Sequence, residues 1–292
     1  MNAFINHLFA GSIASYKDAV YVIFGVPFDS TTSFRTGTRD GPREIRELSY
    51  NFESYVPAHN VDLNDVPFID LGNLDTNAVP NDVMIEVQAV VQDVIKDGKI
   101  PVMIGGEHSI TIGAVRAVKP DMLIVCDAHL DLREEYRGSI YNHACITRRI
   151  YDDGIHDIIH VGSRSGTADQ FVFAQNHLTV FSSAEIQKKG MNPVIQNIQN
   201  RIEGKRVYLS IDADVIDSCL TPGLGTPEPF GLSPENIRDL ISAVAPHSLA
   251  FDYVEVCPAY DHGQAATVGA SMIREYIASH WKANKNNKYL AL

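Results

Sequence analysis

Cysteine is scarce in this sequence, and the few cysteines follow no framework. The 292 residues contain only Cys126, Cys145, Cys219 and Cys257, and no two of them form a CxxC pair. This usage excludes a scaffold stapled by disulfides and is typical of a protein of the reducing cytosol. We therefore expect a cytoplasmic protein that depends on its own hydrophobic core.

The sequence also lacks the features that would place it in a membrane. No apolar run is long enough to cross the hydrocarbon core of a bilayer. The N-terminus has neither a basic n-region nor a long apolar h-region, so no signal peptide is expected.

Basic residues are few: the sequence has 24 Lys and Arg compared with 36 Asp and Glu, and its formal net charge is -12. This balance argues against nucleic acid as a partner and suits a cationic ligand. Taken alone, an acidic surface indicates only solubility, so the charge has to be weighed beside the motifs.

What the sequence does contain is a series of short apolar runs separated by segments of helical periodicity. The runs are rich in Val and Ile, as buried parallel strands are: 21–26, 66–71, 100–104, 122–126, 158–161, 178–181, 207–211 and 249–256. Apolar residues recur on one helical stripe in 83–95, 110–118, 193–202, 237–244 and 265–277. The alternation predicts an α/β fold with a mainly parallel sheet.

The periodicity alone leaves two architectures open. Eight such units fit a closed (β/α)₈ barrel or an open, doubly wound sheet, and both place ligands at the carboxyl ends of strands. No linker-like or low-complexity tract interrupts the chain, so residues 1–292 are expected to form a single domain. The Gly/Pro/Thr-rich segment 221–232 is interpreted as a functional loop.

Three of the predicted strands end in side chains that bind metals. The run 100–104 leads into Gly-Gly-Glu-His-Ser, 122–126 into Asp-Ala-His-Leu-Asp, and 207–211 into Asp-Ala-Asp. The candidate ligands are His108, Asp127, His129, Asp131, Asp212 and Asp214. Buried aspartates are costly unless they are paired or coordinate a metal, so a metal site is the natural explanation.

The spacing and the number of these residues indicate more than one ion. In a continuing strand Asp127 and Asp131 would lie roughly 13 Å apart, too far to hold one ion. The chain therefore has to curl after Asp127, and six ligands suit two metals about 3.5–4 Å apart. A site dominated by carboxylates with some imidazole favours Mn²⁺ over structural zinc.

At this point the sequence resembles the ureohydrolases of the arginase/agmatinase superfamily. GGEHS, DAHLD and SIDADVID match the three signature segments, and the similarity extends to residues 35–43, 225–228 and 252–258. The resemblance implies an open three-layer αβα sandwich with a central, mainly parallel eight-stranded sheet. Glu107 departs from the pattern, because many members carry Asp beside the metal-binding histidine.

The resemblance also implies roles for individual residues. His108, Asp127, Asp131 and Asp212 would hold one Mn²⁺, and Asp127, His129, Asp212 and Asp214 the other. Glu255 would receive the guanidinium group of the substrate, His143 would shuttle protons, and Asp131 would orient the attacking water. Members are commonly trimers or hexamers, so a homo-oligomer is expected.

The substrate depends on the loop Leu132–Asn142, which lacks the Asn- and Ser-rich run of arginases. Glu134 or Glu135 suits a distal amine, whereas Arg133 or Arg137 suits a carboxylate. The similarity to prokaryotic agmatinases favours agmatine, cleaved to putrescine and urea in polyamine biosynthesis. N1-aminopropylagmatine, guanidinobutyrate and arginine are the alternatives.

Two other classes of protein stay open at this stage. A zinc-dependent amide deacetylase of the same fold would hold one metal and would not need His108. A non-catalytic binding protein would lack a ligand, His143 or Glu255, and none of these is missing.

Overall fold

The computed structural model describes residues 7–12 and 14–285. Within them, eight strands form one parallel sheet in the order β4-β1-β5-β10-β9-β6-β7-β8. The strands are β1 (Tyr21–Val26), β4 (Phe68–Asn73), β5 (Ile100–Gly105), β6 (Met122–Cys126), β7 (Ile158–Val161), β8 (Thr179–Phe181), β9 (Val207–Asp212) and β10 (Ser248–Val254). The sheet is open, because β4 and β8 form its two edges and do not pair with each other.

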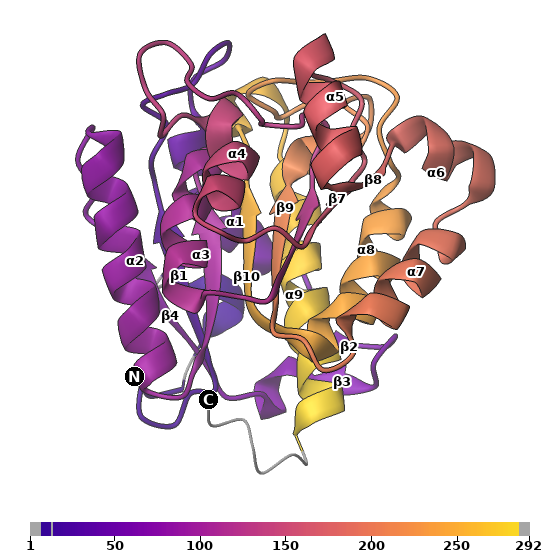
Figure 1. Ribbon diagram of the computed structural model, residues 1–292. Coiled ribbons are helices and arrows are strands. Elements are labelled where there is room, and N and C mark those ends of the chain that lie inside the picture. Colours follow the sequence, from indigo (N-terminus) through magenta and orange to yellow (C-terminus); the bar gives the residue numbers. More distant parts are fainter. Residues whose placement is uncertain (1–6, 13, 286–292) are drawn as a thin grey trace.

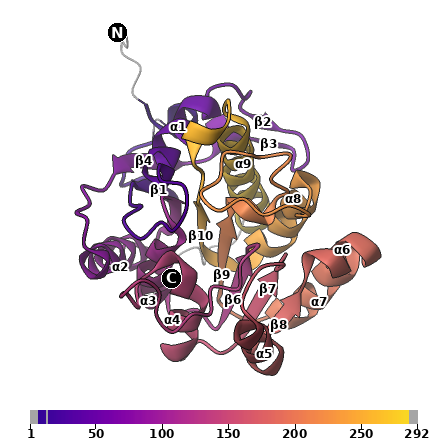
Figure 2. The ribbon, with the colours of Figure 1, turned by 90° about the horizontal axis from the view of Figure 1, so that it is seen from above.

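Helices cover both faces of this sheet and complete a three-layer sandwich (Figures 1 and 2). One face packs against α2 (Pro80–Lys96), α3 (Thr111–Val118) and α4 (Ile146–Asp152). The opposite face packs against α1 (Gly41–Ser49), α6 (Ser183–Lys189), α7 (Asn192–Ile202), α8 (Pro234–Val244) and α9 (Gln264–Asn284). The predicted αβα sandwich is confirmed, and the barrel alternative is wrong for this chain.

The sequence pattern did not indicate α1, α4 and α6, nor the elements that remain to be described. Helix α5 (Ala168–His177) packs near the β8 edge, and a two-stranded hairpin pairs β2 (Tyr55–Val56) with β3 (Val61–Asp62). None of the helices in residues 7–12 and 14–285 combines the length and apolar character needed to cross a bilayer. The expectation about the extreme N-terminus falls partly on residues 1–6, which lie outside the described range.

The strand order brings together ends that are far apart in the sequence. Strands β5, β10, β9 and β6 are adjacent, although β10 is the last of them in the chain. Cys126 at the end of β6 pairs with Ile211 of β9, and Asp212 pairs with Val254 of β10. The residues that follow these four strands therefore emerge side by side at the carboxyl edge of the sheet, where open α/β sheets bind ligands.

One buried histidine, away from that edge, makes the fold sensitive to acid. His280 of α9 is 3% exposed, and its Nδ1 lies 2.8 Å from the hydroxyl of Tyr21 on β1. Burial lowers the pKa of His280 to about 4. Because the folded-state pKa lies below the unfolded value, the neutral ring stabilises the fold above about pH 6.5.

We expect that stabilisation to be lost as the pH falls from about 6.5 towards 4, by about 3 kcal/mol in the free energy of unfolding. Urea titrations across this range measure the loss, and the His280→Gln variant should show a flatter pH dependence. His262 is exposed, so His262→Gln is the matched control and should follow the wild type. Parallel curves for wild type and His280→Gln would contradict the assignment.

Candidate metal centre and active site

The metal-type side chains that the sequence predicts lie at the carboxyl ends of three strands, of which β9 and β6 are neighbours and β5 is separated from β9 by β10. His108 follows β5, the segment from Asp127 to Asp131 follows β6, and Asp212 and Asp214 lie at and just after the end of β9. All six candidate ligands except His129 are buried, and His129 is partly exposed. The strand order, not the distance along the chain, makes them neighbours.

The turn that delivers His108 requires glycine at position 106. A Cβ atom on Gly106 would lie 2.0 Å from the main-chain oxygen of Phe28, a distance that real Cβ atoms do not show. This close approach lets Glu107 N donate to Phe28 O at 2.7 Å and Glu255 N donate to Gly106 O at 2.8 Å. The turn therefore joins the end of β5 to the end of β10 by a hydrogen bond. This fixes the position of His108 relative to the edge of the sheet.

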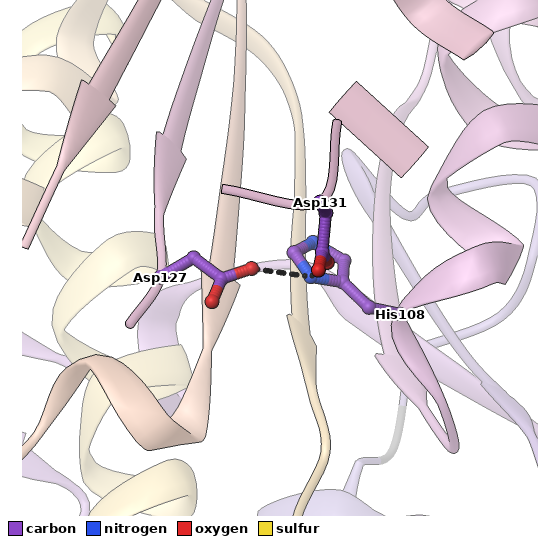
Figure 3. Close-up of side chains that lie close together, drawn as sticks. All are labelled: His108, Asp127 and Asp131. Carbon is purple, nitrogen blue, oxygen red and sulfur yellow. Dashed lines mark hydrogen bonds and ion pairs between the residues drawn. The ribbon is translucent and has the colours of Figure 1, made fainter. Parts of the chain in front are cut away.

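The chain curls after Asp127, as the spacing of the motif demanded. Asp131 has φ +49°, a left-handed conformation that turns the backbone out of the strand direction. As a result His108 Nδ1 lies 3.1 Å from Asp127 Oδ2 and 3.8 Å from Asp131 Oδ2. Figure 3 shows the three side chains converging from their separate segments, and their ligand atoms lie within 4.8 Å of one another.

A second group of ligand atoms shares Asp127 with the first. His129 Nδ1 lies 2.8 Å from Asp214 Oδ2 and 3.7 Å from Asp127 Oδ1. Asp127, His129 and Asp214 also place one ligand atom each within 4.8 Å of the others. Asp127 thus offers one oxygen to each group, which is the arrangement of a carboxylate between two ions.

Asp212 lies between these groups. Its Oδ2 is 3.3 Å from His108 Nδ1, and its Oδ1 accepts a hydrogen bond from Asp214 N at 2.8 Å. The structure therefore brings all six predicted residues to one place.

The electrostatics of this cluster fit divalent cations. Burial, followed by the charges of neighbouring carboxylates, raises the pKa of Asp131 and of Asp212 well above the usual range. Burial also acts to raise the pKa of Asp127, but hydrogen bonds and charges of His108 and His129 hold it below that range. Among the described residues, no Lys or Arg pairs with the four aspartates. A cluster of buried oxygens with two imidazoles and no cationic side chain is suited to metal ions.

His108 is oriented from behind by a chain of hydroxyl and carboxylate groups. Its Nε2 lies 2.9 Å from Ser210 Oγ, which donates to Asp252 Oδ1 at 2.6 Å. Asp252 is buried and also accepts hydrogen bonds from Tyr208 and Thr111. Because Ser210 gives its proton to Asp252, Nε2 donates to Ser210 and Nδ1 is left free for a metal.

A pocket of about 250 Å³ opens above the ligands and brings His143 and Glu255 to the same site. Its walls include Asp131, Asp212, His143 and Glu255, and the loop 221–232 contributes Thr226. A larger cavity of about 360 Å³ lies beside the β2–β3 hairpin, but neither of the two metal-type groups found in the described residues lines it. The chemistry of the lining, not the size of the cavity, therefore assigns the active site.

Glu255 is held in a strained conformation within this pocket. Its φ is +65°, which is unfavourable for a residue with a side chain, and such strain is typical of functional sites. Oε1 accepts a hydrogen bond from His108 N at 2.8 Å, while Oε2 accepts none from the described residues. Burial, together with the charge of Glu107, raises the pKa of Glu255 to about 8. A cation entering the pocket would relieve this repulsion.

His143 lies across the pocket with a depressed basicity. Burial, with a contribution from the charge of His129, lowers the pKa of His143 to about 4. Its ring contacts the hydroxyl groups of Thr31 and Ser33. The sequence reasoning did not identify these two residues, although a Ser/Thr-rich loop directly after a buried strand would have been a usable signal.

The site has one further acidic side chain, in the matching segment 225–228, to which the sequence analysis gave no role. Glu228, on the loop 221–232, places Oε1 3.5 Å from His129 Nε2. The pKa of Glu228 is lowered by this hydrogen bond to His129. Glu228 thereby orients the outer nitrogen of a candidate ligand.

Comparison with known proteins identifies the same family over nearly the whole chain. The Arginase family matches residues 19–278. The chain is 37% identical over 222 residues to the agmatinase of Pyrococcus horikoshii, covering 74% of this chain and 75% of that protein. It is 39% identical over 219 residues to the N(1)-aminopropylagmatine ureohydrolase of Thermococcus kodakarensis, covering 74% of each.

A solved structure agrees with these sequence matches. The crystal structure of agmatine ureohydrolase of Thermoplasma volcanium aligns with a TM-score of 0.92 and 39% identity over 98% of each chain. Since the family match spans residues 19–278, the sequence relatives align over about three quarters of the chain and the superposition covers nearly all of it, we conclude that the chain is an enzyme of the arginase family, a ureohydrolase that lies close to the agmatinases.

Proposed function

We propose that this enzyme hydrolyses the guanidinium group of agmatine to putrescine and urea, using two Mn²⁺ ions. The observation that carries the proposal is the pair of His/Asp groups that share Asp127 beneath a pocket containing Glu255. The names of the relatives support an amine-bearing guanidino substrate, because agmatine and N1-aminopropylagmatine both end in an amine.

Six side chains would hold the metals. His108, Asp127, Asp131 and Asp212 would bind one ion, and Asp127, His129, Asp212 and Asp214 the other. Divalent ions at such a site lower the pKa of water, which supplies a strong nucleophile at neutral pH. This chemistry is needed because the carbon of a guanidinium group is a poor electrophile.

The other residues would bind the substrate and move protons. The free Oε2 of Glu255 would accept hydrogen bonds from the guanidinium and pair its charge. Asp131 would accept a hydrogen bond from the attacking water and aim it at the guanidinium carbon. His143 would pass a proton to the leaving amine as the carbon–nitrogen bond breaks.

The loop after β6 contains groups that can tell one substrate tail from another. Arg133 lines the active-site pocket and stacks on Tyr136, with its guanidinium carbon 4.6 Å from the ring centre. Glu134, Glu135 and Asp169 line an adjoining cavity of about 540 Å³, which shares Arg133 with the pocket. A tail bearing a carboxylate would meet Arg133, whereas a long tail bearing amines would reach the acidic side chains.

This adjoining cavity favours N1-aminopropylagmatine as a second candidate substrate. The additional ammonium group would extend towards Glu135 and Asp169, which have no ion pair among the described residues. Glu134 is already paired with Arg148 at 3.1 Å. The relative from Thermococcus kodakarensis carries the name of this activity.

Urea release from a panel of guanidino compounds in Mn²⁺ buffer tests the substrate assignment. We expect kcat/KM for agmatine or N1-aminopropylagmatine to exceed that for guanidinobutyrate and arginine by at least about tenfold, the effect of one favourable charge contact. Release from arginine alone would contradict the proposed substrate. A strong preference for guanidinobutyrate would indicate that Arg133 recognises the carboxylate of the substrate tail, and it would contradict the assignment of an amine-bearing substrate.

A further inference from the structure

Thr31 lies between a buried carboxylate and the ring of His143. Its hydroxyl oxygen donates to Glu107 Oε1 at 2.6 Å. The same oxygen lies 3.2 Å from His143 Nδ1 and 3.0 Å from the main-chain nitrogen of His143. One hydroxyl group on the loop after β1 therefore joins the residue that precedes His108 to the candidate proton shuttle.

The donors and acceptors of this group can be counted. Glu107 is fully buried and also receives hydrogen bonds from Thr31 N at 2.7 Å and from Ser109 Oγ at 2.5 Å. A carboxylate only accepts, so the single proton of the Thr31 hydroxyl is committed to Glu107. The oxygen of Thr31 is then left as an acceptor, and His143 N–H and Nδ1–H are its two donors.

This count determines which nitrogen of His143 carries the proton. If Nδ1 donates to Thr31, the neutral ring holds its proton there and Nε2 has the free electron pair. Nε2 lies 3.1 Å from Ser33 Oγ, and Ser33 and His143 both line the active-site pocket. The nitrogen with the free pair is therefore the one that faces the substrate side.

We propose that Thr31, anchored by Glu107, is a positioning residue that keeps His143 in the tautomer protonated at Nδ1 and so presents Nε2 for proton transfer. The inference rests on the proposed function, in which His143 serves the leaving amine. It gives Glu107, the residue that departs from the family pattern, a part in orienting that histidine.

The proton balance of the reaction is consistent with this arrangement. The oxygen of the attacking water forms a bond to the guanidinium carbon, and Nε2 accepts one proton from that oxygen and gives it to the amine nitrogen; the second proton of the water follows by the same route. The carbon–nitrogen bond breaks with its electron pair on that nitrogen, and both hydrogens of the water finish on the amine, which leaves as ammonium beside neutral urea. Throughout these steps, His143 Nδ1–H keeps its hydrogen bond to the hydroxyl oxygen of Thr31. The His143 ring therefore keeps its orientation in both its neutral and its charged state.

The Thr31→Val variant tests the proposal, because valine has the shape of threonine without the hydroxyl. We expect kcat with agmatine to fall by about 10- to 100-fold, part of the usual contribution of a positioned acid–base group. KM and bound Mn²⁺ should stay at wild-type values, and Thr31→Ser should restore most of kcat. The hydroxyl of Thr32 donates to Asp29 O and, within the described part of the chain, to no group of His143, so Thr32→Val is the matched control and should retain kcat.

The His143→Gln variant, measured beside these, separates the two claims. Loss of kcat in His143→Gln but not in Thr31→Val would overturn the positioning role and leave the shuttle intact. Full activity in His143→Gln would remove the shuttle itself from the proposed function.

The tautomer of the His143 ring can also be measured in the wild type, so this test does not depend on how the Thr31 variant folds. Nitrogen-15 NMR of the full-length, metal-free chain, with His143 assigned by the glutamine variant, reports the tautomer. We expect a proton on Nδ1 in the wild type. A proton on Nε2, or an equal mixture, would overturn the proposal.

Discussion

Replacing Asp127 by Asn is expected to abolish metal retention and urea release together. The aspartate offers Oδ2 to the group around His108 and Oδ1 to the group around His129, at 3.1 Å and 3.7 Å from the nearest ring nitrogens. An amide of the same shape has one poor ligand atom and one that donates hydrogen bonds, so both ions lose a shared carboxylate. We expect activity to fall at least about 10³-fold, equivalent to about 4 kcal/mol.

Metal analysis after gel filtration, with urea release on the same sample, measures this effect. Asp121→Asn is the matched control, because Asp121 lies just before the start of β6 and pairs on the surface with Arg206. The control should keep its metals and its rate. An Asp127→Asn variant that remained active and fully loaded would refute the role of Asp127 between two ions.

Replacing Glu255 by Gln is expected to reduce kcat/KM for agmatine by about 10²- to 4 × 10³-fold, since a buried cation loses its partner at a cost of about 3–5 kcal/mol. Glu255 is 6% exposed, and its Oε2 is available to the pocket. Glutamine can still accept the hydrogen bond from His108 N through Oε1, so the local fold and the metal content should be kept. The loss therefore reports charge recognition of the substrate.

Steady-state kinetics on metal-loaded samples check this prediction. Glu185→Gln removes the same charge from a partly exposed position on α6 and should leave kcat/KM unchanged. If Glu255→Gln bound and cleaved agmatine as the wild type does, the guanidinium group would have to be recognised by another carboxylate.

The sequence predicted the elements of the fold better than their arrangement. Parallel strands covered on both faces leave continuous Val- and Ile-rich runs, so all eight strands of the sheet were found within a few residues of their ends. The position of β10 between β5 and β9 has no local signal, because it depends on packing between distant segments.

Two of the helices that the sequence did not predict, α1 and α5, have a weak apolar pattern for physical reasons. Helix α1 buries Arg46, whose guanidinium pairs with Asp70 of β4 at 2.6 Å, so a charged residue occupies a core position. Helix α5 buries only Gln170 and Ala174, since it lies near the edge of the sheet. A pattern based on apolar residues does not register either case.

The residues of the candidate site likewise fall into those that the sequence motifs reveal and those that only the fold reveals. Asp127, His129 and Asp131 stand in a short motif that the sequence shows directly, together with His108 and the aspartates after β9. Thr31 and Ser33 reach His143 only through the fold, from a loop more than a hundred residues away in the chain. Their importance depends on the direction of single hydrogen bonds, which no spacing of residues encodes.

The proposed function requires two metal ions, held by the six His and Asp ligands that share Asp127, for the release of urea from a guanidino amine. Titration of Mn²⁺ into the metal-stripped enzyme, with the initial rate of urea release from agmatine as the readout, tests it most directly. We expect the rate to rise until about two ions are bound per chain and then to stay constant. Full activity with a single bound zinc ion, or no urea at any Mn²⁺ loading, would contradict it.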